Sequence, residues 1–352
     1  MLLQRSGSHP LDIIIPRGRL AIYTSRANRY SHALDTSAHT SRIRTFTLYE
    51  DGPKDVKRLA EIFSKPAPNL THLKLVVSYI SVDPTSFPNF FGLEFPKLRV
   101  LEVNGLGAWP EIVGRNLTHL TITDALESLL FNGCISYSPN LKVLKIQGIW
   151  NSDLEIWASP KIALPSGIRL VTKYGLGCPK ILSLFALPPD SFLKVKPSMV
   201  VDWTPSRPLL SHILPRGIND LQNLRALTRL HVKADLDAKI TLQLNCFRLD
   251  GPALEVKIRY SPALQEVTGE SAFPVMGVLD NLEGIVLREV GELRMEGFVG
   301  NLEPQAEELL AFFGRMPVLT KVITTDKNEE KLRSVLDVLD SRAAVIGVDQ
   351  RS

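Results

Sequence analysis

Two stretches of this chain are nearly identical and carry side chains that could do chemistry: "PNLTHLKL" at 68–75 and "RNLTHLTI" at 115–122. Each holds a histidine, His72 or His119, whose imidazole could bind a metal ion. Each also holds an Asn-Leu-Thr triplet, the acceptor pattern for N-glycosylation. The histidines lie 47 residues apart, with no cysteine or carboxylate nearby at ligand spacing. We therefore expect no metal site, and one structural period written twice becomes the simplest explanation.

The start of the chain and its cysteines argue against glycosylation. The opening "MLLQRSGSHP" lacks the apolar core of a signal peptide, so the triplets have no expected use as sugar acceptors. Cys134, Cys178 and Cys246 are odd in number and far apart, which is typical of reduced thiols rather than of a disulfide framework. No run of about 18 apolar residues predicts a membrane span. The expected location is cytoplasmic or nuclear.

Catalytic and cofactor-binding patterns are absent from the sequence. It contains no G-x-S-x-G, G-x-x-x-x-G-K-[ST], H-E-x-x-H or C-x-x-C motif. The seven histidines are scattered, and "GLGCPK" at 175–180 lacks the spacing of a phosphate-binding loop. We expect a protein that is not an enzyme and needs no cofactor.

The charge balance is only mildly basic. Lys and Arg number 41 against 37 Asp and Glu, which gives +4 over 352 residues. Residues 1–46 are the exception, with seven arginines and two aspartates. Such a segment could bind an acidic partner or nucleic acid, although a solvated flank is the commoner case. Nucleic-acid binding is therefore kept as the alternative function.

A six-residue pattern, L-x-x-L-x-L with any aliphatic residue or Phe at the L positions, recurs along the chain. Successive copies start 27, 28, 19 and 24 residues apart, which is the period of leucine-rich repeats. The pattern predicts an α/β leucine-rich-repeat solenoid, with a curved parallel sheet on the concave face and helices or irregular segments on the convex face. Parallel strands are expected to begin near Ile43, Leu70, Leu98, Leu117 and Leu141.

The second half of the chain fits the pattern less regularly. Hexads start at Leu227, Leu282 and Leu319, the last with Thr324 at its sixth position, and "PALEVKIRY" reads as a strand about one period from each neighbour. Residues 188–215 hold six prolines, too many for the interior of a strand or helix. The expected organisation is a capping segment at 1–40, repeats at 41–187, a Pro-rich insertion or junction at 188–218, and repeats with a C-terminal helix at 219–345.

Returning segments are also visible. Apolar residues at helical spacing predict helices within 55–65, 303–317 and 329–340, the second starting near Pro304 and stopping at Gly314. At the other end of the repeats, the apolar run of "LDIII" at 11–15 is expected to form the first strand and to cover the exposed end of the core.

Several segments resemble the large fungal F-box/leucine-rich-repeat-like family: "LQRSGSHPLDIII" (3–15), "HTSRIRTFTL" (39–48), "FPKLRVLEV" (95–103) and "SPNLKVLKI" (138–146), beside the two octapeptides. The resemblance covers roughly 3–187. It implies a substrate receptor of a cullin–RING ubiquitin ligase, in which an N-terminal F-box holds a Skp-type adaptor. The F-box would lie upstream of position 3. We therefore expect adaptor and ligase binding only if an F-box precedes Met1, and a non-functional truncated paralogue remains an alternative.

The hexad also places the residues expected to bind a partner. Its third, fifth and seventh positions point away from the core of a repeat and lie on the concave sheet. The expected function is a non-catalytic protein–protein interaction module whose unknown protein partner docks on that sheet. The residues expected to contact it are Tyr49, His72, Lys74, Glu102, Asn104, His119, Thr121, Lys145, Gln147, Arg229, His231 and Lys233.

Overall fold

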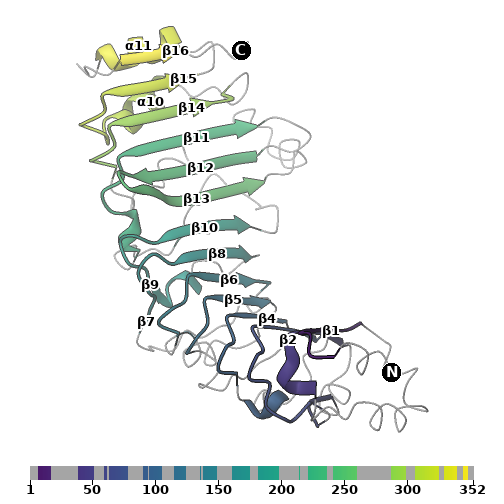
Figure 1. Cartoon of the computed structure of the whole chain (residues 1–352). Helices are drawn as coiled ribbons and strands as arrows, with labels where there is room; N and C mark the ends of the chain where they lie inside the picture. Colours follow the sequence, from purple (N-terminus) through teal and green to yellow (C-terminus); the bar gives the residue numbers. More distant parts are fainter. Residues whose placement is uncertain are drawn as a thin grey trace. The chain divides into compact units, whose positions relative to one another are not determined.

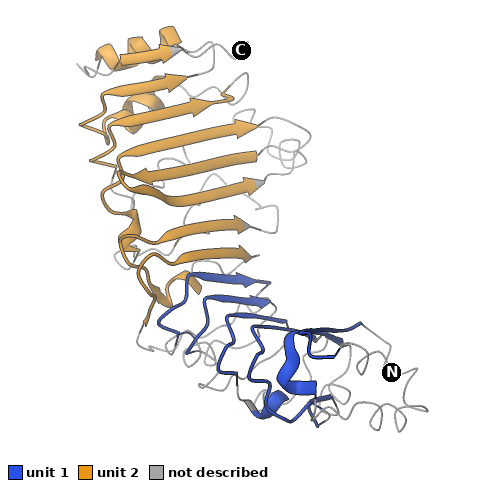
Figure 2. Ribbon diagram, viewed as in Figure 1, with its two compact units in different colours: residues 1–158 blue, residues 159–352 orange. Residues whose placement is uncertain are grey.

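The protein is an α/β protein whose computed structural model falls into two compact units, residues 1–158 and 159–352 (Figure 2). Each unit is built around a mostly parallel β-sheet, with few helices in the described residues. The structure describes residues 7–16, 39–50, 59–61, 63–77, 90–93, 95–104, 115–123, 135, 138–148, 161–174, 181–197, 214, 221–235, 241–259, 287–298, 306–324, 329–338 and 344–347.

Unit 1 contains a parallel sheet whose strands follow one another in sequence order (Figure 1). The five predicted strands are confirmed, with parallel pairing throughout. The first begins at Ile43, and each of the others begins two residues after its hexad does, because the leading leucine is buried in the turn before the strand. The strands are β1 (Leu11–Ile15), β2 (Ile43–Glu50), β3 (His72–Val77), β4 (Val100–Asn104), β5 (His119–Thr123) and β6 (Val143–Gln147).

The core of unit 1 comes from the fourth and sixth hexad positions. Leu73, Leu101, Leu120 and Leu144 share one register row behind the sheet, and each is at most 1% exposed. Stacking these rows buries an apolar face that no single repeat could bury by itself. Short 3-10 turns, η1 (Thr40–Arg42) and η2 (Phe90–Leu93), connect strands here.

The predicted first strand is also confirmed. β1 pairs in parallel with β2, from Leu11 opposite Ile43 to Ile15 opposite Leu48. The strand extends the sheet of unit 1 at the end of its strand order. The run "LDIII" therefore forms the first strand, as expected.

Unit 2 has a different topology, with the strand order β8-β10-β13-β12-β11-β14-β15-β16. β12 runs antiparallel to both β11 and β13, whereas the other pairs are parallel. The strands are β8 (Arg169–Tyr174), β10 (Phe192–Pro197), β11 (Arg229–Asp235), β12 (Thr241–Arg248), β13 (Gly251–Arg259), β14 (Glu292–Glu296), β15 (Lys321–Thr324) and β16 (Ala344–Gly347). β7 (Ile162–Ala163) and β9 (Phe185–Ala186) form a separate small sheet, and η7 (Gln222–Leu224) precedes β11.

Two expectations for the second half were wrong. The Pro-rich range 188–218 holds strand β10, whose one proline, Pro197, is its last residue. Leu287, the end of the hexad at 282, precedes a turn, and the strand lies later, at β14. The strand expected in "PALEVKIRY", in contrast, is confirmed as β13, which lies between β10 and β12 in the sheet. Residues 198–213 and 282–286 lie outside the described part.

The helix predictions agree with the structure where it describes the chain. α10 (Ala306–Phe313) stops before Gly314, and α11 (Glu329–Val338) buries Leu332, Val335 and Leu336. Of the range 55–65, residues 59–61 are helical. None of the described helices is long and apolar enough to cross a membrane.

Candidate partner-binding face

The side chains that alternate with the core residues of unit 1 form one face of its sheet, here called the open face. Because the strands are parallel and in register, these side chains fall into rows that cross the strands. Each of the nine residues predicted in this unit is at least partly exposed. The rows are Thr45, His72, Val100, His119 and Val143; Thr47, Lys74, Glu102, Thr121 and Lys145; and Tyr49, Val76, Asn104, Thr123 and Gln147.

The repeated Thr-His pair connects each strand to its neighbour. Thr71 Oγ1 donates to Arg44 O at 3.1 Å, and Thr118 Oγ1 donates to Arg99 O at the same distance. His72 Nδ1 lies 2.9 Å from Thr71 Oγ1, and His119 Nδ1 lies 3.0 Å from Thr118 Oγ1. Since each hydroxyl proton is already used, Nδ1–H is the donor in the neutral ring and Nε2 is left as an acceptor.

The asparagines of the repeated triplets are structural too. Asn69 Nδ2 donates to Ser41 O at 2.6 Å, and Asn116 Nδ2 donates to Pro96 O at 2.8 Å. Asn140 makes a longer bond of the same kind, 3.5 Å, to Arg115 O. Each amide therefore ties one turn to the turn before it. Within the described residues no three His, Cys, Asp or Glu side chains are grouped as a metal site would require.

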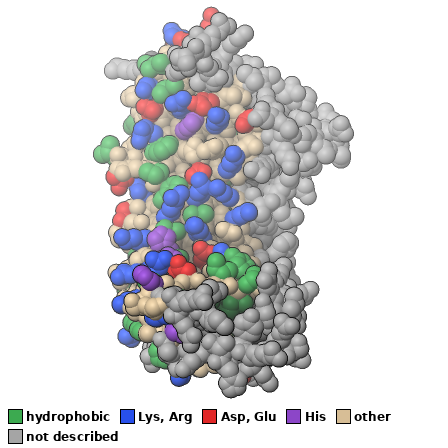
Figure 3. Space-filling view, turned by 45° about the vertical axis from the view of Figure 1, so that its right-hand side comes forward, with side chains coloured by type: hydrophobic (Ala, Val, Ile, Leu, Met, Phe, Trp, Pro, Cys, Tyr) green, Lys and Arg blue, Asp and Glu red, His purple; other side chains and the backbone are tan. Residues whose placement is uncertain are grey.

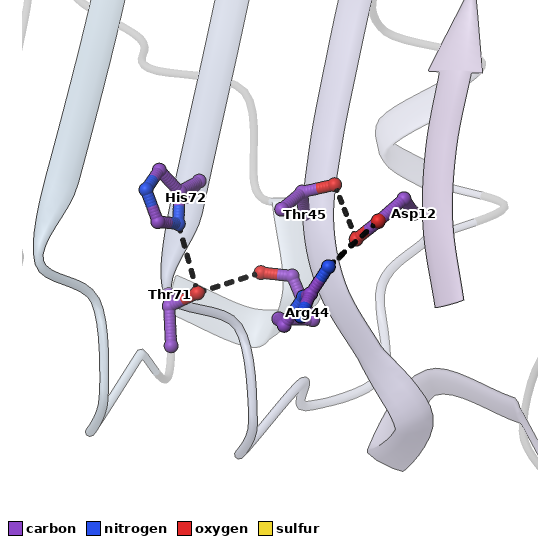
Figure 4. A network of polar contacts seen from close by, with 5 residues as sticks. All are labelled: Asp12, Arg44, Thr45, Thr71 and His72. Atoms are coloured by element: carbon purple, nitrogen blue, oxygen red, sulfur yellow. Dashed lines mark hydrogen bonds and ion pairs between the residues drawn. The ribbon is translucent and has the colours of Figure 1, made fainter. Parts of the chain in front are cut away.

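A polar network joins the first strands of unit 1 (Figure 4). Asp12 of β1 accepts from Arg44 Nη2 at 2.9 Å and from Thr45 Oγ1 at 2.8 Å. The hydrogen bond from Arg44 is the main reason why the pKa of Asp12 lies below its ordinary value. Thr71 and His72 extend the network to β3 through the Arg44 carbonyl. β1 is thus held to β2 by side chains as well as by its backbone.

Three of the predicted residues meet in the middle of the open face. Lys74 Nζ lies 2.8 Å from Glu102 Oε2 and 5.9 Å from the centre of the Tyr49 ring. Hydrogen bonding to Glu102 raises the pKa of Lys74. Because Tyr49, Lys74 and Glu102 come from three adjacent strands, they form a preassembled aromatic and charged cluster. Thr121 and Lys145 continue the row of Lys74 and Glu102.

The three predicted residues of unit 2 lie on β11 and belong to a different cluster. Lys233 Nζ is 3.8 Å and His231 Nε2 is 3.5 Å from Glu296 Oε2 on β14. Arg294 also pairs with Glu296, which is only 8% exposed. His231 Nε2 is buried and makes no hydrogen bond among the described residues. Burial is the first cause that lowers the pKa of His231.

Arg229, the third of these residues, covers an aromatic ring. Its guanidinium lies 5.1 Å from the centre of the Phe247 ring on β12, and Arg169 lies 5.2 Å from that of Phe192 in the same way. The sequence did not predict Glu296 or Arg294 as site residues, nor the two arginine–phenylalanine contacts. The available signal was Asp250-Gly251 between two alternating runs, which favours a β-hairpin and would have placed β12 beside β13.

Comparison with known proteins gives no relative: no family model, no curated protein and no solved structure matches the chain. Assignment of a function therefore depends on the residues of the open face.

Proposed function

We propose that this protein is a leucine-rich-repeat solenoid and a non-catalytic protein–protein interaction module that binds its partner through the open face. The observation that carries the proposal is the register of unit 1. Rows of polar and charged side chains cross its parallel strands, while the alternating residues are buried. Parallel stacking at a period of 19–28 residues is what leucine-rich repeats produce.

The chemistry of the open face of unit 1 favours a protein partner. It combines an aromatic ring, both signs of charge, amides and histidines within a few strands, as in Tyr49, Lys74, Glu102 and Asn104. Tyrosine is a typical anchor of protein interfaces, and charged residues around it contribute specificity. A duplex nucleic acid would instead favour a broad surface of one sign. The family resemblance adds a specific form of the proposal, in which this face recognises substrates for a ubiquitin ligase.

The test compares capture of proteins from a cell lysate by three purified chains. They are the wild type, the open-face variant Tyr49→Ala/Lys74→Ala/Lys145→Ala, and a control variant Lys65→Ala/Arg115→Ala/Lys142→Ala. The control changes exposed side chains that lie outside the strands. We expect specific partners to be captured by the wild type and the control and lost from the open-face variant. Circular dichroism and melting temperature establish that each variant is folded.

Two results would overturn the proposal. One is an unchanged set of captured proteins from a folded open-face variant. The other is equal loss from both variants, which would show that general surface charge rather than this face holds the partners.

A further inference from the structure

A row of lysines crosses the open face of unit 2, that is, the side chains of its sheet that alternate with the buried ones. Lys173 of β8 and Lys196 of β10 are register partners, and both are exposed. Val195 of β10 is opposite Val256 of β13, and Lys196 and Lys257 are the next residues on these two parallel strands. Lys257 therefore continues the row beside Lys196. Neighbouring strands are about 4.8 Å apart, so the backbone positions of these three lysines span about 10 Å.

The row continues on the next two strands. Lys257 is opposite Gln243 of β12, and Gln243 is opposite Lys233 of β11. Gln243 Nε2 donates to Asn245 Oδ1 at 3.2 Å, which leaves further amide groups on the same face. From Lys173 to Lys233 the row crosses four inter-strand steps, about 19 Å in all. Figure 3 shows Lys and Arg side chains gathered over part of this face.

The three neighbouring lysines lack counter-charges within the described part of the chain. Lys194, two residues before Lys196 on β10, is paired with Glu255. Lys233 has Glu296 at 3.8 Å. No ion pair involves Lys173, Lys196 or Lys257 among the residues that the structure describes. Like charges on adjacent strands repel, so this arrangement is unfavourable unless an anionic partner binds it.

The surroundings of the row favour an acidic protein segment over a nucleic acid. Bases bind best where aromatic rings are free to stack. The rings on this face, Phe192 and Phe247, are already covered by Arg169 and Arg229. An extended peptide presents a side chain on one side about every 6.6 Å, so four carboxylates span about 20 Å, which is close to the length of the row.

We propose that Lys173, Lys196, Lys257 and Lys233 bind an extended acidic segment of the partner protein, which lies across the strands of unit 2. This inference rests on the proposed function, since it assigns an acidic segment of the same protein partner to the open face of unit 2. Charge complementarity supplies the affinity, and the amides of Gln243 and Asn245 provide hydrogen bonds to the segment.

The experiment measures fluorescence anisotropy of a labelled peptide of about 12 residues, alternating glutamate and serine. The full chain is compared with the row variant Lys173→Glu/Lys196→Glu/Lys257→Glu. The matched control is Lys65→Glu/Lys142→Glu/Arg288→Glu, which changes the net charge equally at exposed positions outside the strands. A Lys→Gln version of the row variant removes the charges with less risk to folding. Oligothymidine of the same length tests nucleic acid.

We expect the wild type and the control to bind the glutamate peptide, and the row variants to bind it about tenfold more weakly or worse. A peptide with glutamine in place of glutamate should not bind. The inference is overturned if the wild type does not bind the glutamate peptide, if control and row variants lose equal affinity, or if oligothymidine binds as tightly through the same lysines. The lysate capture uses residues of unit 1, so the proposed function can hold when this inference fails.

Discussion

The two units use the same kind of strand in different ways. In unit 1 each described strand is parallel to the described strand before it, and the strand order equals the sequence order. In unit 2 the strands β11, β12 and β13 form an antiparallel meander within an otherwise parallel sheet. The difference lies in what precedes each strand. β3 to β6 follow leucines at most 1% exposed, whereas β13 follows Leu249, which is 92% exposed in a tight turn.

This contrast suggests a rule for reading such sequences. A buried aliphatic residue shortly before a strand holds a turn that returns from the far side of the core, and the strand then adds in parallel. A strand that starts directly after a two-residue turn must run antiparallel to its predecessor. Alternation within the strand is the same in both cases, so alternation alone does not give direction.

The largest expected effect comes from the buried rows of unit 1. Leu73→Ala or Leu120→Ala removes a side chain that is 1% exposed, and each should lower the free energy of unfolding by about 2–5 kcal/mol. His72→Ala and His119→Ala, at exposed positions beside them, should cost far less. Denaturant unfolding followed by circular dichroism measures both pairs. Equal losses for leucine and histidine variants would contradict the assignment of rows.

The next effect probes unit 2, where one glycine allows the end of β14 to pass close to β11. Gly297 has φ +79°, and a methyl group there would overlap the carbonyl oxygen of Ala234. Gly297→Ala should therefore cost about 2 kcal/mol or more. Gly7→Ala is the control, because Gly7 also has positive φ, +54°, but nothing within 4 Å of the added atom. A melting temperature that Gly297→Ala lowers no more than Gly7→Ala does would show that the close approach is unimportant.

A smaller loss of stability is expected from replacing one asparagine in each unit, Asn223 in unit 2 and Asn116 in unit 1. Asn223 is fully buried and donates from Nδ2 to Ala253 O at 2.9 Å, whereas Asn116 makes its bond at an exposed position. Asn223→Ala should cost about 1–3 kcal/mol, because the Ala253 carbonyl loses its side-chain donor away from water. Asn116→Ala should cost about 1 kcal/mol or less, since water replaces the amide. Thermal unfolding of both variants ranks them, and a larger loss for Asn116→Ala would contradict the account.

How much of this could be read from the sequence depends on the residue that carries each feature. The strands at Ile43, Leu70, Leu98, Leu117 and Leu141 were predictable, because each hexad supplies its own buried residues. β8 was missed because its inward positions are Leu170 and Thr172, and a threonine breaks the aliphatic pattern although it is fully buried. β10 was missed because the proline density around it masked the alternation of Leu193 and Val195.

The candidate site divides in the same way. The outward positions of unit 1 follow from the hexad alone, so Tyr49, Lys74 and Glu102 are predictable without knowledge of their contacts. Contacts made by residues of strands that the sequence did not predict could not be predicted either. Lys173 and Lys196 become neighbours only through the pairing of β8 with β10, and Glu296 meets His231 only because β14 pairs with β11. Contacts between strands distant in sequence require the strand order.

The smallest predicted effect is a pH dependence in unit 2. Burial lowers the pKa of His231 below the ordinary value of 6.5, so the unfolded chain takes up the proton first as pH falls. Stability present above about pH 6.5 should decline toward the lowered pKa of the folded protein, and His231→Gln should lack this loss. The melting temperature of the wild type relative to His231→Gln should therefore fall between about pH 7.5 and 5.5. His119→Gln, at an exposed position, is the control, and a relative melting temperature that rises on acidification would contradict this sign.

The central claim, that a protein partner docks on the open face, is tested most directly by lysine acetylation followed by mass spectrometry. The purified chain is acetylated alone and in a cell lysate, and the rate is compared lysine by lysine. Lys74 and Lys145 lie on the open face of unit 1, whereas Lys65 and Lys142 are exposed outside the strands. We predict that the lysate slows acetylation of Lys74 and Lys145 relative to Lys65 and Lys142. Protection of Lys65 and Lys142 with none at the open-face lysines would contradict the account.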